Sequence, residues 1–221
     1  MTDQITPTEF DKLGDVRDWV CVGRAAFTFY PTGSLADAVE LVRSIGEAAG
    51  AGHARPDIDI RPAGVTVRLL TAAADVFGLT GEDVAVARRI SEAARRLGLT
   101  AAPEAAQNLV ITIDALVIAA VLPFWRAVLG YEPRPDTPSK ELVDPRRRGA
   151  GVYFQQMDAP RTGRNRIHLD VWVPFEQAEA RVEAALAAGG KLVSDEHAPG
   201  WWILADPEGN EACVATWVAA G

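Results

Sequence analysis

The sequence predicts an α+β protein of two successive domains, a small α+β domain followed by a pair of βαβββ modules. Strand-like and helix-like segments alternate over the first hundred residues. The unpatterned stretch Thr100–Ala105 then interrupts them and is interpreted as a linker. Beyond it, a strand followed by a helix occurs twice, and the strand positions Val110 and His168 lie 58 residues apart. We therefore expect domains at 1–102 and 107–221.

Composition excludes several classes of protein. The 221 residues are 48% hydrophobic and 24% charged, which is typical of a folded globular protein. The net charge of −8 disfavours a nucleic acid partner, and Arg146–Arg148 is interpreted as a solvated loop. The apolar run Leu109–Trp125 contains Asp114 and Pro123, so no membrane span is expected. Because Met1–Gln4 does not begin a signal peptide, we expect a cytoplasmic protein.

The first hundred residues contain recognisable strands and helix starts. Ser34 with Asp37, and Thr80 with Asp83, have the spacing of N-terminal helix caps. The expected elements are a strand over 19–30, a helix from Ser34 to Gly50, strands over 57–61 and 65–71, and a helix from Thr80 to Leu97.

The motifs within these elements resemble the pterin-4a-carbinolamine dehydratase family. They are Pro56-Asp57, the strand Val65–Thr71, and Gly78-Leu79-Thr80 with Asp83, and the resemblance covers roughly Val20 to Leu97. It implies the dehydratase fold and an activity that expels water from a carbinolamine.

That activity depends on a His-His-Pro cluster and on another histidine after the strand that ends in threonine. Here Ala54 and Arg55 precede Pro56, and Ala72 follows the strand. Alanine cannot transfer a proton, and His53 is interpreted as a solvent-exposed loop residue. We therefore expect a retained fold with a degenerate dehydratase site.

Two segments of the second half resemble the vicinal oxygen chelate superfamily, which includes glyoxalase I, extradiol dioxygenases and bleomycin-resistance proteins. They are Phe124–Tyr131, which ends in Leu-Gly-Tyr, and the turn Asp206–Asn210. The resemblance spans about Gln107 to Trp217 and implies two βαβββ modules that form a cup-shaped sheet around a cavity. Because this fold supports many chemistries, it does not define the reaction.

The resemblance also implies metal-ligand positions, and most are unsuitable here. By position the ligands fall on Val110, His168, Gln155 or Gln156, and Cys213. Valine cannot bind a metal, glutamine is a poor ligand, and Glu211 lies two residues away from the expected position. We therefore expect no catalytic metal and no cofactor.

Alternation along the strands predicts a polar and aromatic face in the cup. From Arg166 to Val173, alternation places Arg166, His168, Asp170 and Trp172 on one face. By the same period, one face of an earlier segment holds Tyr153, Gln155 and Met157, and one face of the last segment holds Glu211, Cys213 and Trp217. The expected catalytic residues are His168, Asp170 and Glu211. The expected substrate-binding residues are Tyr153, Gln155, Arg166, Trp172, Cys213 and Trp217.

These residues suit a metal-independent lyase, isomerase or cyclase that acts on a small organic metabolite. His168 would be the general acid or base. The dehydratase-like half would then serve for docking or dimerisation in a homodimer. Three alternatives remain open: a drug-sequestering protein, a 4a-hydroxytetrahydrobiopterin dehydratase that uses His53 and Asp83, and a metal-dependent glyoxalase or dioxygenase.

Overall fold

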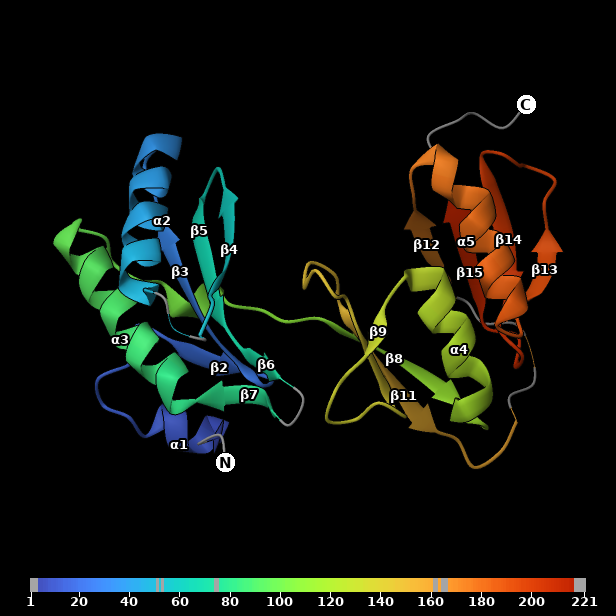
Figure 1. Ribbon diagram of the computed structural model, residues 1–221, viewed down its shortest axis with the longest axis horizontal. Helices are drawn as coiled ribbons and strands as arrows, with labels where there is room; N and C mark the ends of the chain where they lie inside the picture. The colour runs from blue at the N-terminus through green and yellow to red at the C-terminus, as the bar shows by residue number, and fades with distance from the viewer. Residues whose placement is uncertain are drawn as a thin grey trace. The chain divides into compact units, whose positions relative to one another are not determined.

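A computed structural model describes residues 4–50, 52, 54–73, 76–160, 163 and 167–216 of the protein (Figure 1). The chain divides into two compact units, Met1–Asn108 and Leu109–Gly221. Three residues singled out from the sequence, His53, Arg166 and Trp217, lie outside the described residues.

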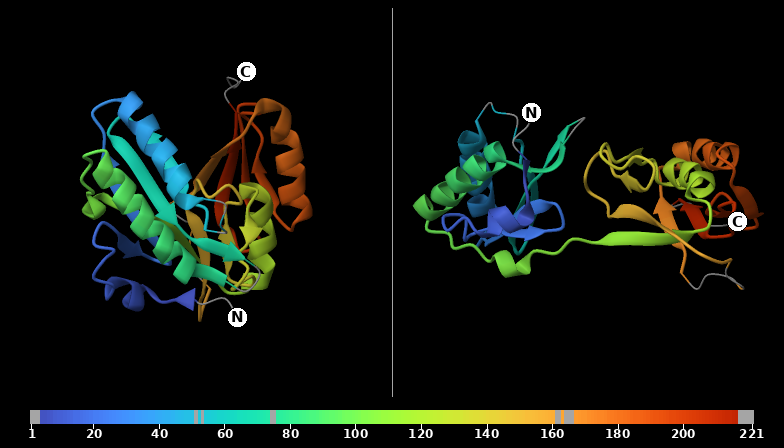
Figure 2. Two further views of the ribbon diagram at one scale, coloured as in Figure 1. Left: turned by 60° about the vertical axis from the view of Figure 1, so that its left-hand side comes forward. Right: turned by 90° about the horizontal axis from the view of Figure 1, so that it is seen from below.

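The N-terminal unit combines two antiparallel sheets with helices. Its helices are α1 (Pro7–Asp11), α2 (Leu35–Ala49), α3 (Gly81–Arg96) and the short 3-10 helix η1 (Pro103–Ala105). Its strands are β1 (Gln4–Ile5), β2 (Val20–Val22), β3 (Ala25–Pro31), β4 (Asp57–Arg61), β5 (Gly64–Leu69), β6 (Thr71–Ala73) and β7 (Val76–Thr80). The strand orders are β2-β3-β5-β4 and β1-β7-β6. Helices α2 and α3 cover the four-stranded sheet, and residues such as Leu41, Val67 and Ile90 are buried in their common core (Figure 2).

The predicted helix starts are confirmed. The Ser34 hydroxyl accepts a hydrogen bond from the backbone N–H of Asp37 at 3.1 Å and begins α2. Thr80 and Asp83 form a reciprocal capping box at the start of α3. Helix α2 ends at Gly50, whose φ of 67° is easily adopted only by glycine.

The single strand predicted over 19–30 is wrong. It is a hairpin, because Gly23 has a φ of 65° and turns the chain between β2 and β3. Trp19 lies before the hairpin, and its indole N–H donates to the carbonyl of Ala87 and the hydroxyl of Ser91. The strand expected over 65–71 is also divided, since β5 ends at Leu69 and β6 pairs with β7 in the other sheet.

The stretch interpreted as a linker packs on the N-terminal unit. The backbone N–H of Ala102 donates to the carbonyl of Phe29 at 2.7 Å. Leu99 and Ala101 lie against the hydrophobic core of this unit. Residues 100–105 are therefore anchored rather than extended between the two units.

The C-terminal unit is built from two βαβββ modules, which confirms the predicted fold class. The first contains β8 (Val110–Ala115), α4 (Ile118–Leu129), β9 (Glu132–Pro133), β10 (Glu141–Val143) and β11 (Gly151–Gln156). The second contains β12 (Leu169–Trp172), α5 (Phe175–Ala187), β13 (Lys191–Ser194), β14 (Trp201–Ala205) and β15 (Glu211–Ala215). The sheet orders are β8-β11-β10-β9 and β12-β15-β14-β13, and in each module the first and last strands pair in parallel.

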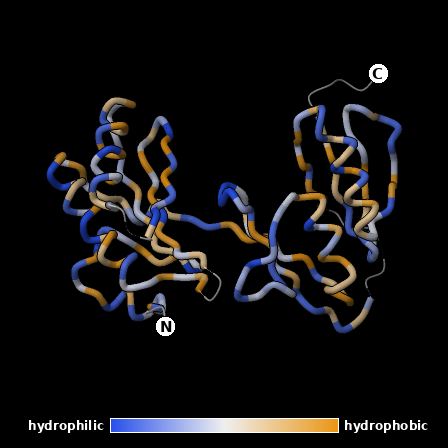
Figure 3. Tube along the Cα trace, viewed as in Figure 1, coloured by the Kyte–Doolittle hydropathy of each residue, from blue (hydrophilic) through white to orange (hydrophobic). Residues whose placement is uncertain are grey.

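Helices α4 and α5 lie side by side in this unit (Figures 1 and 2). Their inner faces share one core with the covered faces of the sheets, and Phe124, Trp125, Phe154, Val182 and Val214 are among its buried members. Hydrophobic and hydrophilic stretches alternate along the chain in both units, as expected for elements with one covered face (Figure 3). Within the described ranges, no helix combines the length and apolarity needed to cross a bilayer.

Candidate functional site

Strand β12 carries an open face of polar and aromatic side chains. Leu169 and Val171 pack into the core, whereas Asp170 and Trp172 lie on the opposite side. The predicted alternation is therefore confirmed over these four residues, and 69% of the Trp172 surface is exposed. His168 directly precedes β12, and its side chain is also exposed.

A cluster of three chemically active side chains occupies this face. His168 Nε2 lies 3.3 Å from Asp170 Oδ1, and about half of each side chain is exposed. Cys213 pairs with Asp170 across the parallel strands β12 and β15 and is buried. One ligand atom from each of the three residues lies within 4.8 Å of the other two. The structure thus brings an imidazole and a carboxylate, two residues apart in the chain, together with a thiol that lies 45 residues after the imidazole.

The strand register places a second aromatic residue on the same face. Trp172 pairs with Ala215, and Ala215 pairs with Trp201 on β14, so a small residue separates two indoles along one row. The imidazole of His197 stacks on Trp201 with ring centroids 4.3 Å apart, and His197 is partly buried. Strand alternation allows only one of the adjacent residues Trp201 and Trp202 to face this side. Trp202 is the one that packs against the core.

Three other predicted site residues that the structure describes, Glu211, Tyr153 and Gln155, do not join this cluster. Glu211 pairs with Ala205 at the other end of β15 and lies outside the group of three ligand atoms. Tyr153 and Gln155 lie on β11 in the first module's sheet, paired with β8. No hydrogen bond or ion pair between described residues connects Tyr153 or Gln155 to His168. The convergent cavity expected from the sequence therefore stays a prediction.

The potential metal ligands in this cluster differ from those considered from the sequence. The sequence offered Glu211 as the acidic ligand beside His168 and Cys213, whereas the structure places Asp170 beside them. Imidazole nitrogen, carboxylate oxygen and thiolate sulfur are all ligands that zinc accepts. These three residues therefore fit a borderline-soft divalent ion by the chemistry of their donors.

The turn Asp206–Asn210 has a structural role. The buried carboxylate of Asp206 accepts hydrogen bonds from the backbone N–H groups of Glu208 and Asn210, both at 2.9 Å. The Glu208 carboxylate accepts from the backbone N–H groups of Leu116 and Val117, at the start of α4. Because Val117 itself provides no side-chain cap, the turn of the second module caps the helix of the first.

Both halves of the chain match known families. Residues 3–93 match the pterin 4 alpha carbinolamine dehydratase family, and residues 110–215 match the glyoxalase-like domain family. A protein of Nocardia farcinica (strain IFM 10152), assigned by name to pterin-4-alpha-carbinolamine dehydratase, is 44% identical over 84 residues, which cover 38% of this chain and 85% of that protein. A similarly named protein of Roseiflexus castenholzii (strain DSM 13941 / HLO8) is 35% identical over 82 residues, which cover 37% and 86%. The chain belongs to the pterin-4a-carbinolamine dehydratase family.

The second half adds a glyoxalase-like unit to the dehydratase unit. Among solved structures, a glyoxalase-related enzyme from Fulvimarina pelagi is 22% identical, with a TM-score of 0.40. The likeness covers 50% of this chain and 87% of that enzyme.

The dehydratase unit lacks the histidines of its family at the matching positions. Buried Ala54 and exposed Arg55 precede Pro56, and Ala72 is exposed after Thr71. The chain has three histidines, of which His168 and His197 belong to the glyoxalase-like unit. Among the described residues, the dehydratase unit therefore holds no imidazole.

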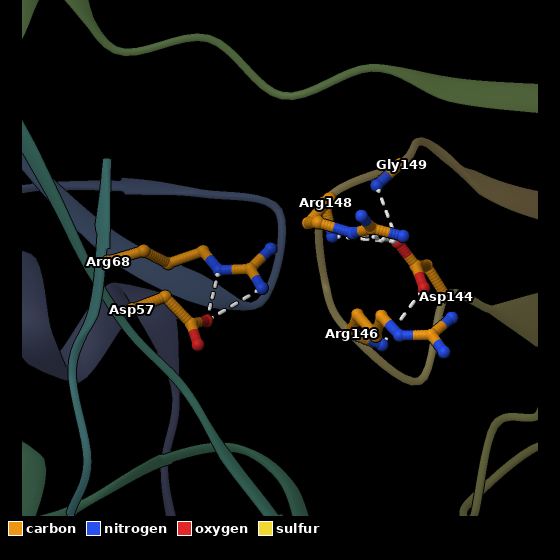
Figure 4. Close-up of polar contacts among 6 residues, drawn as sticks. All are labelled: Asp57, Arg68, Asp144, Arg146, Arg148 and Gly149. Carbon is orange, nitrogen blue, oxygen red and sulfur yellow. Dashed lines mark hydrogen bonds and ion pairs between the residues drawn. The ribbon is translucent and has the colours of Figure 1, made fainter. Parts of the chain in front are cut away.

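The acidic residues that remain near this site have structural partners. Asp83 is fully buried, and its Oδ2 accepts from the hydroxyl of Thr71 at 2.8 Å and from Thr80 at 2.9 Å. Two nitrogens of Arg68 donate to one oxygen of Asp57 at 2.9 and 2.7 Å, across β4 and β5 (Figure 4). Both acids stabilise the local fold by these contacts.

Proposed function

We propose that the glyoxalase-like unit is a metal-independent enzyme of the lyase, isomerase or cyclase type, which acts on a small organic molecule at the open face of the β12-β15-β14-β13 sheet. The observation that carries this proposal is the contact of 3.3 Å between His168 Nε2 and Asp170 Oδ1 beside Cys213. An imidazole held by a carboxylate at an accessible surface is a typical general acid–base arrangement.

We infer a role for each side chain of the cluster. When the Nε2–H of neutral His168 donates a hydrogen bond to Asp170, the lone pair of Nδ1 is free to accept a proton from the substrate. Asp170 fixes the tautomer and stabilises the imidazolium that forms, and His168 then returns the proton at another atom of the substrate. The row of Trp172, Ala215 and Trp201 offers apolar surface for the remainder of the substrate.

We assign the dehydratase unit to self-association rather than to dehydration. Ala54 and Ala72 stand where proton-transferring groups are needed, which supports a loss of activity. Helix α2 exposes Leu35 and Val39, which are 70% and 55% accessible and lie one turn apart. Such an apolar stripe on a surface helix favours contact with a second copy of the chain, in a homodimer.

A metal-dependent reaction is the second candidate, and the spacing of the three ligand atoms favours it. His168, Asp170 and Cys213 would hold a zinc-like ion, since one ligand atom from each lies within 4.8 Å of the others. When bound, the ion would supply Lewis-acid polarisation of a substrate oxygen. In that case the imidazole and carboxylate would bind the metal and would not act as an acid–base pair.

The first experiment is the metal content of untagged protein that has never been exposed to chelator, measured by elemental mass spectrometry. It is repeated after incubation with zinc, manganese, iron and nickel salts. Stoichiometry near zero throughout supports acid–base chemistry. About one tightly held ion per chain, lost in Asp170→Asn, overturns the metal-independent proposal in favour of the second candidate.

The second experiment separates an enzyme from a sequestering protein. A panel of aromatic and carbonyl metabolites is screened by thermal shift, and products are detected by mass spectrometry. His168→Ala should abolish turnover of any substrate found, while His197→Ala, which removes the stacked imidazole, should mainly weaken binding. Ligands that bind without turnover, and equally well to His168→Ala, would overturn the enzymatic proposal.

A further inference from the structure

The glyoxalase-like unit has a groove of about 540 Å³ beside helices α4 and α5, separate from the His168 cluster. Arg126 and Arg181 line it from the two helices, with Tyr131 and Glu132 from the segment that follows α4. Apolar atoms of Leu122, Pro123 and Ala127 form part of its wall. The groove thus combines two guanidinium groups with apolar surface.

Arg181 is held in place by the end of helix α4. Its Nη1 donates to the carbonyl of Val128 at 2.9 Å. The guanidinium lies against Gly130, where a Cβ atom would stand only 2.8 Å from Nη1. A guanidinium has five N–H donors, so this capping bond leaves others for a ligand.

A loop with further arginines lies at the rim of the groove. The carboxylate of Asp144 accepts from the backbone N–H groups of Arg146, Arg148 and Gly149 at 2.9 to 3.0 Å, which fixes the loop (Figure 4). Tyr131 connects this loop to the groove, since its hydroxyl lies where a Cβ at Gly149 would be. Burial lowers the pKa of Arg181, and the nearby positive charge of Arg146 lowers it further.

Two of the guanidinium groups in the groove form no ion pair with the described residues, although the chain has a net charge of −8. Arg68, Arg96 and Arg134 each form an ion pair with a carboxylate. Arg126 and Arg181 form none with the described residues. Helix capping accounts for one bond of Arg181, but not for Arg126, which lines the same groove, or for Arg146, whose charge acts on Arg181. A bound anion would remove the repulsion between these guanidinium groups.

We propose that this groove binds the phosphate group of a small phosphorylated metabolite, with Arg181 and Arg126 as direct ligands and Arg146 at the rim. Arginine suits this role because its planar fork of donors matches phosphate oxygens. Glu132 lines the same groove and would accept a hydrogen bond from a hydroxyl or amino group of the ligand. A phosphate ester with a neighbouring hydroxyl is therefore favoured over free phosphate.

The test measures binding of inorganic phosphate and of glycerol 3-phosphate by isothermal titration calorimetry, at constant ionic strength set with chloride. Both should bind to the full chain, and glycerol 3-phosphate should bind more tightly. Arg126→Ala and Arg146→Ala should each weaken binding about tenfold. Arg148→Ala is the matched control, because it removes an equal charge from the same loop, and the Arg148 charge is already paired with Asp144, whose Oδ2 lies 3.7 Å from its Nε. Circular dichroism verifies that each variant is folded.

Two results would overturn the proposal. One is the absence of any heat with either phosphate compound. The other is an equal loss of affinity in Arg148→Ala, which would mean diffuse attraction to a basic loop rather than a built site. Glu132→Gln should leave the affinity for inorganic phosphate unchanged or improve it. Equal affinity of the parent chain for inorganic phosphate and glycerol 3-phosphate would reject the preference for an ester.

Discussion

The indole nitrogen of Trp125 donates a hydrogen bond to Oδ2 of Asp206 over 2.9 Å, and both residues are buried. This bond joins helix α4 of the first module to the β14–β15 turn of the second. The same carboxylate also accepts from Glu208 and Asn210. The two sequence segments that resemble the glyoxalase-like fold are therefore in direct contact, although the bonded residues are 81 positions apart in the chain.

Removing the Trp125 bond should destabilise the glyoxalase-like unit alone. Trp125→Phe keeps most of the packing but leaves a buried carboxylate oxygen with one donor fewer, which costs about 2 kcal/mol. Urea unfolding followed by circular dichroism measures the effect, and separate transitions are expected for the two units. Trp19→Phe is the control, because its indole bonds lie in the dehydratase unit. If both variants shift the same transition, the two units do not unfold independently.

Glu208 should act as a helix cap supplied from a distant turn. Glu208→Ala removes the acceptor of two backbone N–H groups at the start of α4, and we expect a loss of about 1–2 kcal/mol in the free energy of unfolding. Glu208→Gln retains one acceptor and should lose less. Glu196→Ala, at an exposed site in the turn that precedes β14, should change little. Equal stability of Glu208→Ala and the parent chain would show that α4 needs no such cap.

Cys21 should be unreactive in the folded protein. Burial raises the pKa of its thiol to about 12, with a further contribution from the charge of Asp11. At pH 8 the thiolate is therefore rare in the folded state and common in the unfolded state, whose thiol pKa is about 8.5. In a Cys213→Ala background, iodoacetamide should alkylate Cys21 at least about a hundredfold more slowly without urea than with it.

The raised pKa of the Cys21 thiol also predicts how the free energy of unfolding changes with pH. Because the folded-state pKa is raised, the contribution of Cys21 to stability is fully present below about pH 8.5 and is lost as the pH rises towards 12. Unfolding of Cys21→Ser should therefore depend less steeply on pH over this range than unfolding of the parent. An equally steep dependence would assign the loss to other groups.

Self-association through α2 should be sensitive to charge at Leu35 or Val39. Leu35→Glu places a carboxylate in the apolar stripe and should raise the dimer dissociation constant at least about tenfold. Ala36→Glu adds the same charge to a neighbouring face of the helix and serves as the control. Sedimentation equilibrium measures both, and a parent chain that is monomeric at all concentrations would contradict the homodimer.

Much of the fold could be predicted from local patterns. The helices α2 and α3 begin at the predicted capping residues, because a hydroxyl and a carboxylate three residues apart satisfy the exposed N–H groups locally. The hairpin at Gly23 was missed because the hydrophobic pattern continues across it. The strands predict the duplication, and a pair of turns is a second sign of it. Asp144-Pro145 and Asp206-Pro207 begin equivalent turns, in which each aspartate accepts from the N–H groups two and four residues later.

The candidate site could be predicted only in part. Strand alternation placed Asp170 and Trp172 on one face and Cys213 on the side of its strand that faces the cup, since side chains alternate regardless of what surrounds them. It could not reveal that Asp170 pairs with Cys213, that Trp201 shares their row, or that Tyr153 lies in the other sheet. Each of those facts depends on strand register and sheet order.

The sequence by itself determined the two families, the order of elements and the faces of individual strands, because these follow from local spacing and residue type. Tertiary structure decided which side chains meet: His168 with Asp170 and Cys213, Trp125 with Asp206, and Arg181 with the end of α4. Contacts between residues far apart in the chain depend on how the modules pair and pack, and no local pattern encodes that pairing.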